Sequence, residues 1–110
     1  MIDETIGKIE TRIQSADSIK EDRKRELLQL LAKLKSEAAE LSKTHDEQAQ
    51  SIAGFAQVSA HEATREQRNP ELLDLSLQGL RSSVAGFEQS HPKLAQIVNA
   101  ISNTLSNLGI

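Results

Sequence analysis

The chain of 110 residues lacks cysteine, tryptophan and tyrosine, and it contains two phenylalanines and two prolines. Without cysteine it has no disulfide, no thiolate metal ligand and no cysteine nucleophile. Aromatic rings supply much of the surface of ligand pockets and interface anchors, so their scarcity argues against a ring-lined pocket. Because proline interrupts helices, the two prolines mark few breaks in the chain. Leucine, isoleucine and alanine must therefore build most of the core.

The charge is nearly balanced, with 13 basic and 16 acidic side chains and a net charge of −3. Proteins that bind the phosphate backbone of nucleic acids depend on clustered Lys and Arg, so we expect no nucleic-acid partner. Residues 94–110 carry no charge, but they are fewer than the roughly 20 apolar residues of a membrane span. Residues 1–10 contain no apolar run of the kind found in a signal peptide. We therefore expect a cytoplasmic protein that does not span a membrane.

Apolar side chains recur every three or four residues along the chain, and no stretch alternates with a period of two. This spacing predicts helices and no strands. We expect an all-α single domain over 1–110, which forms an elongated helical hairpin or bundle with coiled-coil-like packing. The longest predicted helix would measure about 70 Å, at about 1.5 Å per residue. The four helices that we expect span roughly 2–14, 19–67, 70–89 and 92–108.

Local signals support several of these helix ends. Ser18–Glu21 fits a capping box, in which a Ser oxygen and a Glu carboxylate satisfy backbone amides at a helix start. Asn69 precedes Pro70 and suits the cap of the next helix. Thr44–Glu47 is a second candidate capping box. The alternative to one continuous helix over 19–67 is therefore a break at that point.

A few residues invite a chemical interpretation. His61–Arg65 begins like the zinc-protease motif, but that motif needs a second histidine where this chain has arginine. Glu88 and His91 have the Glu-x-x-His spacing of di-iron bundles, which need a second such pair and two further carboxylates. Because Pro92 follows directly, we expect His91 to occupy a helix junction, and we expect His45 to be solvated or to line a helix seam. We therefore expect no catalytic, cofactor-binding or metal-binding residue.

Three short patterns suggest surfaces. Arg23–Arg25 is a basic run, but neighbouring acids make a solvated helix face the favoured interpretation over a phosphate or acidic-partner contact. Three asparagines, Asn99, Asn103 and Asn107, either face solvent or form a buried ladder that sets an oligomer's register. Five alanines spaced three and four apart either let another helix approach closely or form an exposed face that suits helix propensity. This alanine stripe consists of Ala49, Ala53, Ala56, Ala60 and Ala63.

The end of the chain carries a recognisable pattern. Phe87–Leu94, with the sequence FEQSHPKL, is followed by Ile101, Leu105 and the ending Leu108–Ile110. This pattern resembles the carboxyl-terminal signature of a small bacterial family, domain of unknown function 4404, and the leucine-rich amino-terminal half is similar only in general character. The resemblance implies a small helical bacterial protein without an assigned activity. It also marks a shared helix junction, made of Phe87, Glu88, His91 and Pro92.

The last predicted helix carries an apolar stripe, here called the C-terminal seam, which we expect one short chain with few aromatic residues to leave partly uncovered. A second chain would cover it. We therefore expect a homo-oligomer, dimeric or higher, that acts as a non-enzymatic interaction or scaffold protein, with a further protein partner as an option. The alternatives are a metal-binding bundle built around Glu88 and His91 from two subunits, and a nucleoid-associated or membrane-surface protein that binds through Arg23–Arg25. The C-terminal seam consists of Leu94, Val98, Ile101, Leu105 and Leu108.

Overall fold

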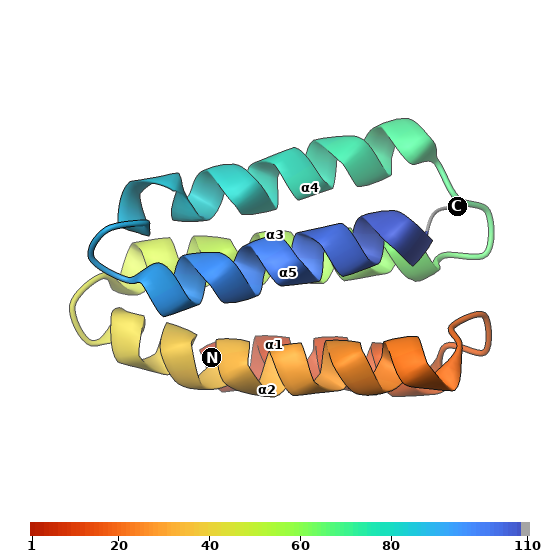
Figure 1. Ribbon diagram of the computed structural model, residues 1–110, viewed down its shortest axis with the longest axis horizontal. Helices are drawn as coiled ribbons and strands as arrows, with labels where there is room; N and C mark the ends of the chain where they lie inside the picture. Colours follow the sequence, from red (N-terminus) through yellow and green to blue (C-terminus); the bar gives the residue numbers. More distant parts are fainter. Residues whose placement is uncertain (109–110) are drawn as a thin grey trace.

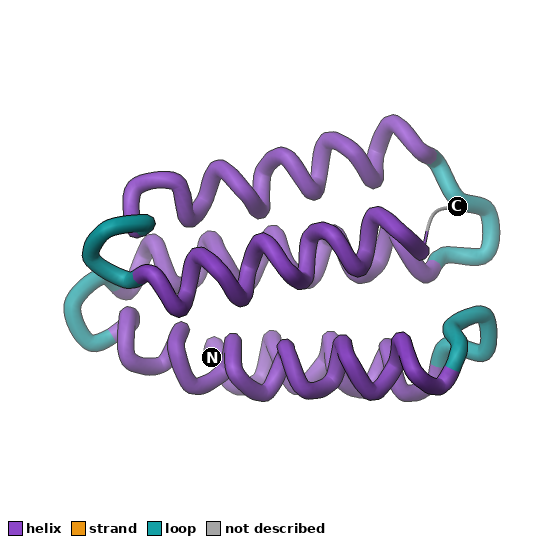
Figure 2. The backbone as a smooth tube through the Cα atoms, viewed as in Figure 1, coloured by secondary structure: helices purple, strands orange, loops and turns teal. Residues whose placement is uncertain are grey.

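The computed structural model describes residues 1–108. Within them the chain forms five α-helices, one short 3-10 helix and no strand (Figure 2). The all-helical class predicted from the periodicity is confirmed, with one α-helix more than expected. The elements are α1 (Ile2–Ser15), α2 (Glu21–Ser42), α3 (Asp46–Thr64), α4 (Pro70–Val84), η1 (Ala85–Phe87) and α5 (Pro92–Leu108).

Helices α2 to α5 form an antiparallel four-helix bundle. Each packs on the next along the chain, and α5 closes the ring against α2 (Figure 1). Short connecting turns make consecutive helices run in opposite directions. Helix α1 packs on α2 and α3 alone among the helices of residues 1–108, and it runs parallel to α3. The molecule measures 37 × 24 × 21 Å, so the elongated shape expected from the sequence is wrong.

Four isoleucines attach α1 to the bundle. They recur every three or four residues, so they share one face of the helix, and all of them are buried. Two polar contacts lie beside them: Lys35 Nζ donates to Glu10 Oε1 at 2.9 Å, and Arg12 Nε donates to Thr64 Oγ1 at 2.6 Å. Exposed ion pairs contribute at most about 1 kcal/mol, so apolar burial holds the helix in place. The isoleucines are Ile2, Ile6, Ile9 and Ile13.

The alanine stripe of α3 is buried. Each of its five residues is at most 1% exposed. Helix α3 packs on α1, α2, α4 and α5, so it is the most enclosed helix of the described chain. Side chains of a single methyl group allow the closest approach of helix axes. Close helix packing is therefore the right interpretation of the stripe, and an exposed alanine face is wrong.

Helices α2 and α3 are separate, so the continuous helix predicted over 19–67 is wrong and the alternative break is correct. In the turn between them, the amide of His45 donates to the Leu41 carbonyl at 2.7 Å, and Thr44 Oγ1 donates to the same oxygen at 3.3 Å. The first turn of α3 carries Asp46 and Glu47, whose negative charges stabilise the helix start by interacting with the positive end of the helix dipole. A straight helix would leave two long apolar faces exposed. Folding back at this turn buries both in one core.

The boundaries of α4 agree with the sequence at one end. Asn69 caps the helix, because its Oδ1 accepts hydrogen bonds from the amides of Glu71 at 3.1 Å and Leu72 at 3.2 Å. The predicted helix over 70–89 ends early, at Val84, where the backbone tightens into η1. The 3-10 turn and the loop after it carry the chain across to the start of α5.

The capping box predicted at Ser18–Glu21 does not form. Helix α2 begins at Glu21, and its cap residue, Lys20, makes no side-chain capping bond. Ile19 instead lies in the core, 6% exposed, within the connection that precedes the helix. The predicted helix-ending role of Gly109 and the packing of Ile110 lie outside the described residues.

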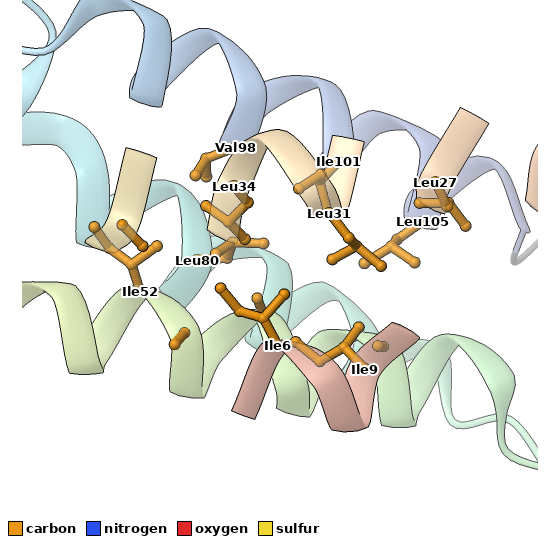
Figure 3. Close-up of a cluster of buried hydrophobic side chains, with 14 of the residues drawn as sticks. Ile6, Ile9, Leu27, Leu31, Leu34, Ile52, Leu80, Val98, Ile101 and Leu105 are labelled. Atoms are coloured by element: carbon orange, nitrogen blue, oxygen red, sulfur yellow. The ribbon is translucent and has the colours of Figure 1, made fainter. Parts of the chain in front are cut away.

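The core lies where the apolar faces of the five α-helices meet (Figure 3). In residues 1–108 its fully buried large side chains are all leucine and isoleucine. Two buried hydroxyls, Ser59 Oγ and Ser102 Oγ, have no hydrogen-bond partner among the described residues. The scarcity of aromatic residues therefore produced an aliphatic core with no ring-lined cavity at its centre.

Candidate functional site

The C-terminal seam is covered within one chain. Four of its residues, Leu94, Val98, Ile101 and Leu105, are at most 2% exposed, and Leu108 is half-buried. Side chains of α2 and α4, including Leu31 of α2, pack against them (Figure 3). The expectation that a second chain must cover this seam therefore does not hold in this fold. The reason is that α2 turns back into α3, which lets one chain surround α5 with its own helices.

The asparagine stripe of α5 lies on the opposite side of the helix from the C-terminal seam. Asn99, Asn103 and Asn107 are all exposed. In the described chain they therefore form a solvent-facing stripe rather than a buried ladder. This outcome is the one expected of amide side chains, which lose hydrogen bonds to water when they are buried without partners.

The predicted helix junction brings three rings together. Phe87 and His91 are half-buried, and their ring centroids are 5.5 Å apart. The third ring belongs to His45 from the turn between α2 and α3, 5.5 Å from Phe87 and 6.3 Å from His91. Glu88 is exposed. The junction therefore groups two histidines and a phenylalanine, rather than a glutamate and a histidine.

Sequence analysis missed the pairing of His45 with His91. The two residues are far apart in the sequence, and one of them lay within the predicted continuous helix. The signal that pointed to the pair was the alternative break at Thr44–Glu47, which places His45 at the end of a helix. In an antiparallel bundle, that end lies beside the start of α5.

The segment His61–Arg65 forms no zinc-protease site. Glu62 is 8% exposed, and Arg65 donates to its carboxylate with a nitrogen-to-oxygen distance of 2.9 Å. His61 is exposed and lies 3.9 Å from the same carboxylate. Where the motif has a second histidine, this chain has the cation that neutralises the glutamate. The arrangement is an ion pair at the end of α3.

The basic run at Arg23–Arg25 is a solvated face of α2. Arg23 lies 3.6 Å from the Glu26 carboxylate, and Lys24 Nζ donates to the Gln14 carbonyl at 3.0 Å. Two of the three basic side chains thus already have partners within the chain. This agrees with the favoured interpretation, in which interleaved acids and bases cover an exposed helix.

Two further features are absent from residues 1–108. No group of three or more His, Cys, Asp or Glu side chains lies close enough together there to hold a metal ion. Within the same range, no helix combines the length and the apolarity that crossing a bilayer requires.

The most unusual surface lies on α3 and α4. Apart from Met1, the large apolar side chains that are exposed in residues 1–108 are 41% to 61% exposed and all belong to these two helices. Single exposed apolar residues are normal, but a group of them marks an interaction surface. We call this surface the α3–α4 face. It consists of Phe55, Val58, Leu72 and Leu75.

Close packing makes the α3–α4 face continuous. The ring of Phe55 lies directly over Gly79 of α4, where an added Cβ would meet a ring carbon at 2.4 Å. Because the two helices are antiparallel, the next turn of α3, with Val58, lies level with the preceding turn of α4, with Leu75. Leu72 lies one turn nearer the start of α4 than Leu75 does. Sequence analysis missed this face, because its residues do not share one helix.

The known proteins offer little comparison. No curated protein and no solved structure matches the chain. A family model does match, and it covers residues 2–110 rather than the carboxyl-terminal segment alone. The residues of the helix junction and of the end of α5 resemble this family, and the family match includes α1 and α2 as well. The chain belongs to the family described as domain of unknown function (DUF4404).

Proposed function

We propose that the protein is a non-enzymatic helical interaction protein that self-associates through the α3–α4 face. The observation that carries the proposal is the gathering of Phe55, Val58, Leu72 and Leu75 on one side of the bundle, each 41% to 61% exposed. Contiguous apolar surface of this kind loses contact with water when two proteins bind, which favours association.

The distribution of charge supports a protein partner. Residues 48–60 of α3 and residues 75–80 of α4 contain no charged side chain. In contrast, residues 20–26, at the start of α2, are all charged, and both signs are present. Interface cores are depleted in charge and enriched in aromatic residues, and the α3–α4 face has both properties. A partner that docks there removes few charges of this chain from water.

Two features favour a second copy of this chain as the partner. First, a face without formal charge can pair with itself without placing like charges together. Second, α4 carries Glu71 and Asp74 at its start and Arg81 towards its end. Antiparallel pairing of two α4 helices about a twofold axis level with Ser76 places Arg81 of each chain at the level of Glu71 of the other. The charges on α4 are thus complementary in a symmetric dimer.

The absence of a catalytic arrangement among the described residues fits this proposal without carrying it. His45 and His91 lie together at one end of the bundle, His61 lies on α3, and the buried carboxylate of Glu62 is paired with Arg65.

The substitution Leu75→Glu tests the proposal. Leu75 is 61% exposed, so the folded chain tolerates a carboxylate there, whereas an interface across Leu75 would have to bury two of them close together. We expect the mass measured by light scattering after size-exclusion chromatography to fall from that of an oligomer to that of a monomer, with unchanged helicity by circular dichroism.

The matched control is Asn103→Glu, which adds the same charge at an exposed position of α5, away from the α3–α4 face. We expect this variant to keep the wild-type mass. A wild-type protein that stays monomeric at high concentration would refute the proposal. So would a Leu75→Glu variant with the wild-type mass.

A further inference from the structure

The fold places two of the chain's three histidines at one end of the bundle. His45 lies in the turn between α2 and α3, and His91 directly precedes α5. Their ring centroids are 6.3 Å apart, and each ring packs edge-to-face against Phe87 at 5.5 Å, with interplanar angles of 81° and 83°. The phenylalanine thus holds both imidazoles near each other.

Backbone hydrogen bonds fix both histidines in position. The His45 amide donates to the Leu41 carbonyl at 2.7 Å, and the His45 carbonyl accepts from the Ala49 amide at 3.0 Å. The His91 amide donates to the Phe87 carbonyl at 2.8 Å, and the His91 carbonyl accepts from the Ala95 amide at 3.2 Å. Each histidine is therefore bonded to a helical turn on both sides, although neither lies inside a long helix.

The Nδ1 atom of each ring already has a partner. His45 Nδ1 lies 2.8 Å from Thr44 Oγ1, and His91 Nδ1 lies 3.0 Å from Ser90 Oγ. When the Thr44 hydroxyl donates to the Leu41 carbonyl, 3.3 Å away, it accepts the proton of His45 Nδ1 and leaves the lone pair on His45 Nε2. His91 has the same arrangement when its Nδ1 donates to Ser90 Oγ. Histidines that bind metals use this arrangement, in which one ring nitrogen is hydrogen-bonded and the other coordinates.

We propose that His45 and His91 together bind one divalent transition-metal ion through their Nε2 atoms. An imidazole nitrogen lies about 2.0 to 2.1 Å from the ion, which puts each ring centroid roughly 3.2 Å from it and the two centroids at most about 6.4 Å apart, when the rings lie on opposite sides of the ion. The observed 6.3 Å falls at the upper end of that range. At this separation both Nε2 atoms must face the space between the two rings, and His45 is exposed, so its side chain is free to turn towards a shared ion.

The donor set selects the kind of metal. Imidazole suits copper, zinc and nickel, whereas magnesium and calcium require oxygen ligands. No third His, Cys, Asp or Glu joins the pair within residues 1–108, so water fills the remaining positions. Copper(II) binds such nitrogen and oxygen sets more tightly than zinc(II) or nickel(II) does, so it is the ion that the site holds best. Because His45 and His91 come from separate segments, the bound ion joins the α2–α3 turn to the start of α5.

The sequence predicts no metal ligand here, because the pair of Glu88 and His91 has no second copy and Pro92 indicates a helix junction. It also predicts that His45 is solvated or lines a helix seam. The fold replaces that glutamate with a second histidine. This inference is independent of self-association, since the histidine pair and the α3–α4 face share no residue.

Calorimetric titration of the full chain with copper(II) chloride, and separately with zinc(II) chloride, tests the site. We expect one copper ion per chain, and an affinity that falls at least tenfold in His45→Ala and in His91→Ala. His61→Ala is the matched control, because His61 is exposed on α3 and has no part in the site, and we expect it to bind as the wild type does. Because a ligand that binds only the folded state raises its stability, copper should also raise the melting temperature of the wild type and of His61→Ala, but not of the other two variants.

Electron paramagnetic resonance identifies the ligands directly. The copper signal of the wild type should show coupling to imidazole nitrogen, and this coupling should weaken in His45→Ala, a variant that we expect to fold because the side chain is exposed. The proposal is overturned if copper does not bind, if binding persists unchanged in His45→Ala, as it would at the amino terminus, or if His61→Ala loses as much affinity as His45→Ala.

Discussion

The substitution Ile101→Asp would place a carboxylate in the centre of the core. Ile101 is 1% exposed and lies beside Leu31 and Leu105 (Figure 3). A carboxyl group buried there at pH 7 must lose its hydration or take up a proton. Protonation costs about 4 kcal/mol, because pH 7 lies about three units above the usual titration range of a carboxyl and each unit costs about 1.4 kcal/mol. Loss of the buried aliphatic side chain adds about 2 kcal/mol.

The expected destabilisation is therefore about 6 kcal/mol, which is comparable to the whole free energy of unfolding of a small domain, about 5 to 15 kcal/mol. Burial favours the protonated carboxyl, so the folded variant binds a proton more tightly than the unfolded chain does. The deficit relative to the wild type should consequently shrink as the pH falls from 7 towards 4. Urea unfolding followed by circular dichroism at both pH values measures this change.

Asn103→Asp is the matched control, since it adds the same charge two residues along α5 at an exposed position. We expect it to change the free energy of unfolding by less than about 0.5 kcal/mol. The reasoning fails if Ile101→Asp keeps its helicity and stability at pH 7 and merely lowers the mass of an oligomer. That result would place Ile101 at an interface between chains instead of inside one.

Two further substitutions test individual contacts by urea unfolding. Asn69→Ala removes the side chain that caps α4 and should lower the free energy of unfolding by about 1 kcal/mol; an equal loss in the exposed variant Asn99→Ala would contradict a capping role. Ser102→Ala removes a buried hydroxyl without a partner in the described residues and should raise the free energy of unfolding by up to about 1 kcal/mol. A clear loss of stability in this variant would mean that the Ser102 hydroxyl has a hydrogen-bond partner.

The sequence by itself determined the features that depend on neighbouring residues. The spacing of apolar side chains gave the helical class, because a helix needs an apolar stripe only on the face that it buries. Pro70 and Pro92 began helices as predicted, and Asn69 capped the first of these, because a proline ring and a side-chain cap act within one turn. The apolar stripe of α5 marked the face that this helix buries, from Leu94 to Leu105, although not what covers it.

Tertiary packing decided what covers each stripe and which distant residues meet. The periodicity runs through the α2–α3 turn with no proline to stop it, so only the burial of both helices in one core shows that the chain folds back there. That single turn enclosed the C-terminal seam within the chain and placed His45 beside His91. The connection between α3 and α4 set Phe55 over Gly79, and so created the α3–α4 face. A pattern along the chain records which face of a helix is apolar, but the partner of that face depends on contacts between residues far apart in sequence, and these are made only in the folded state.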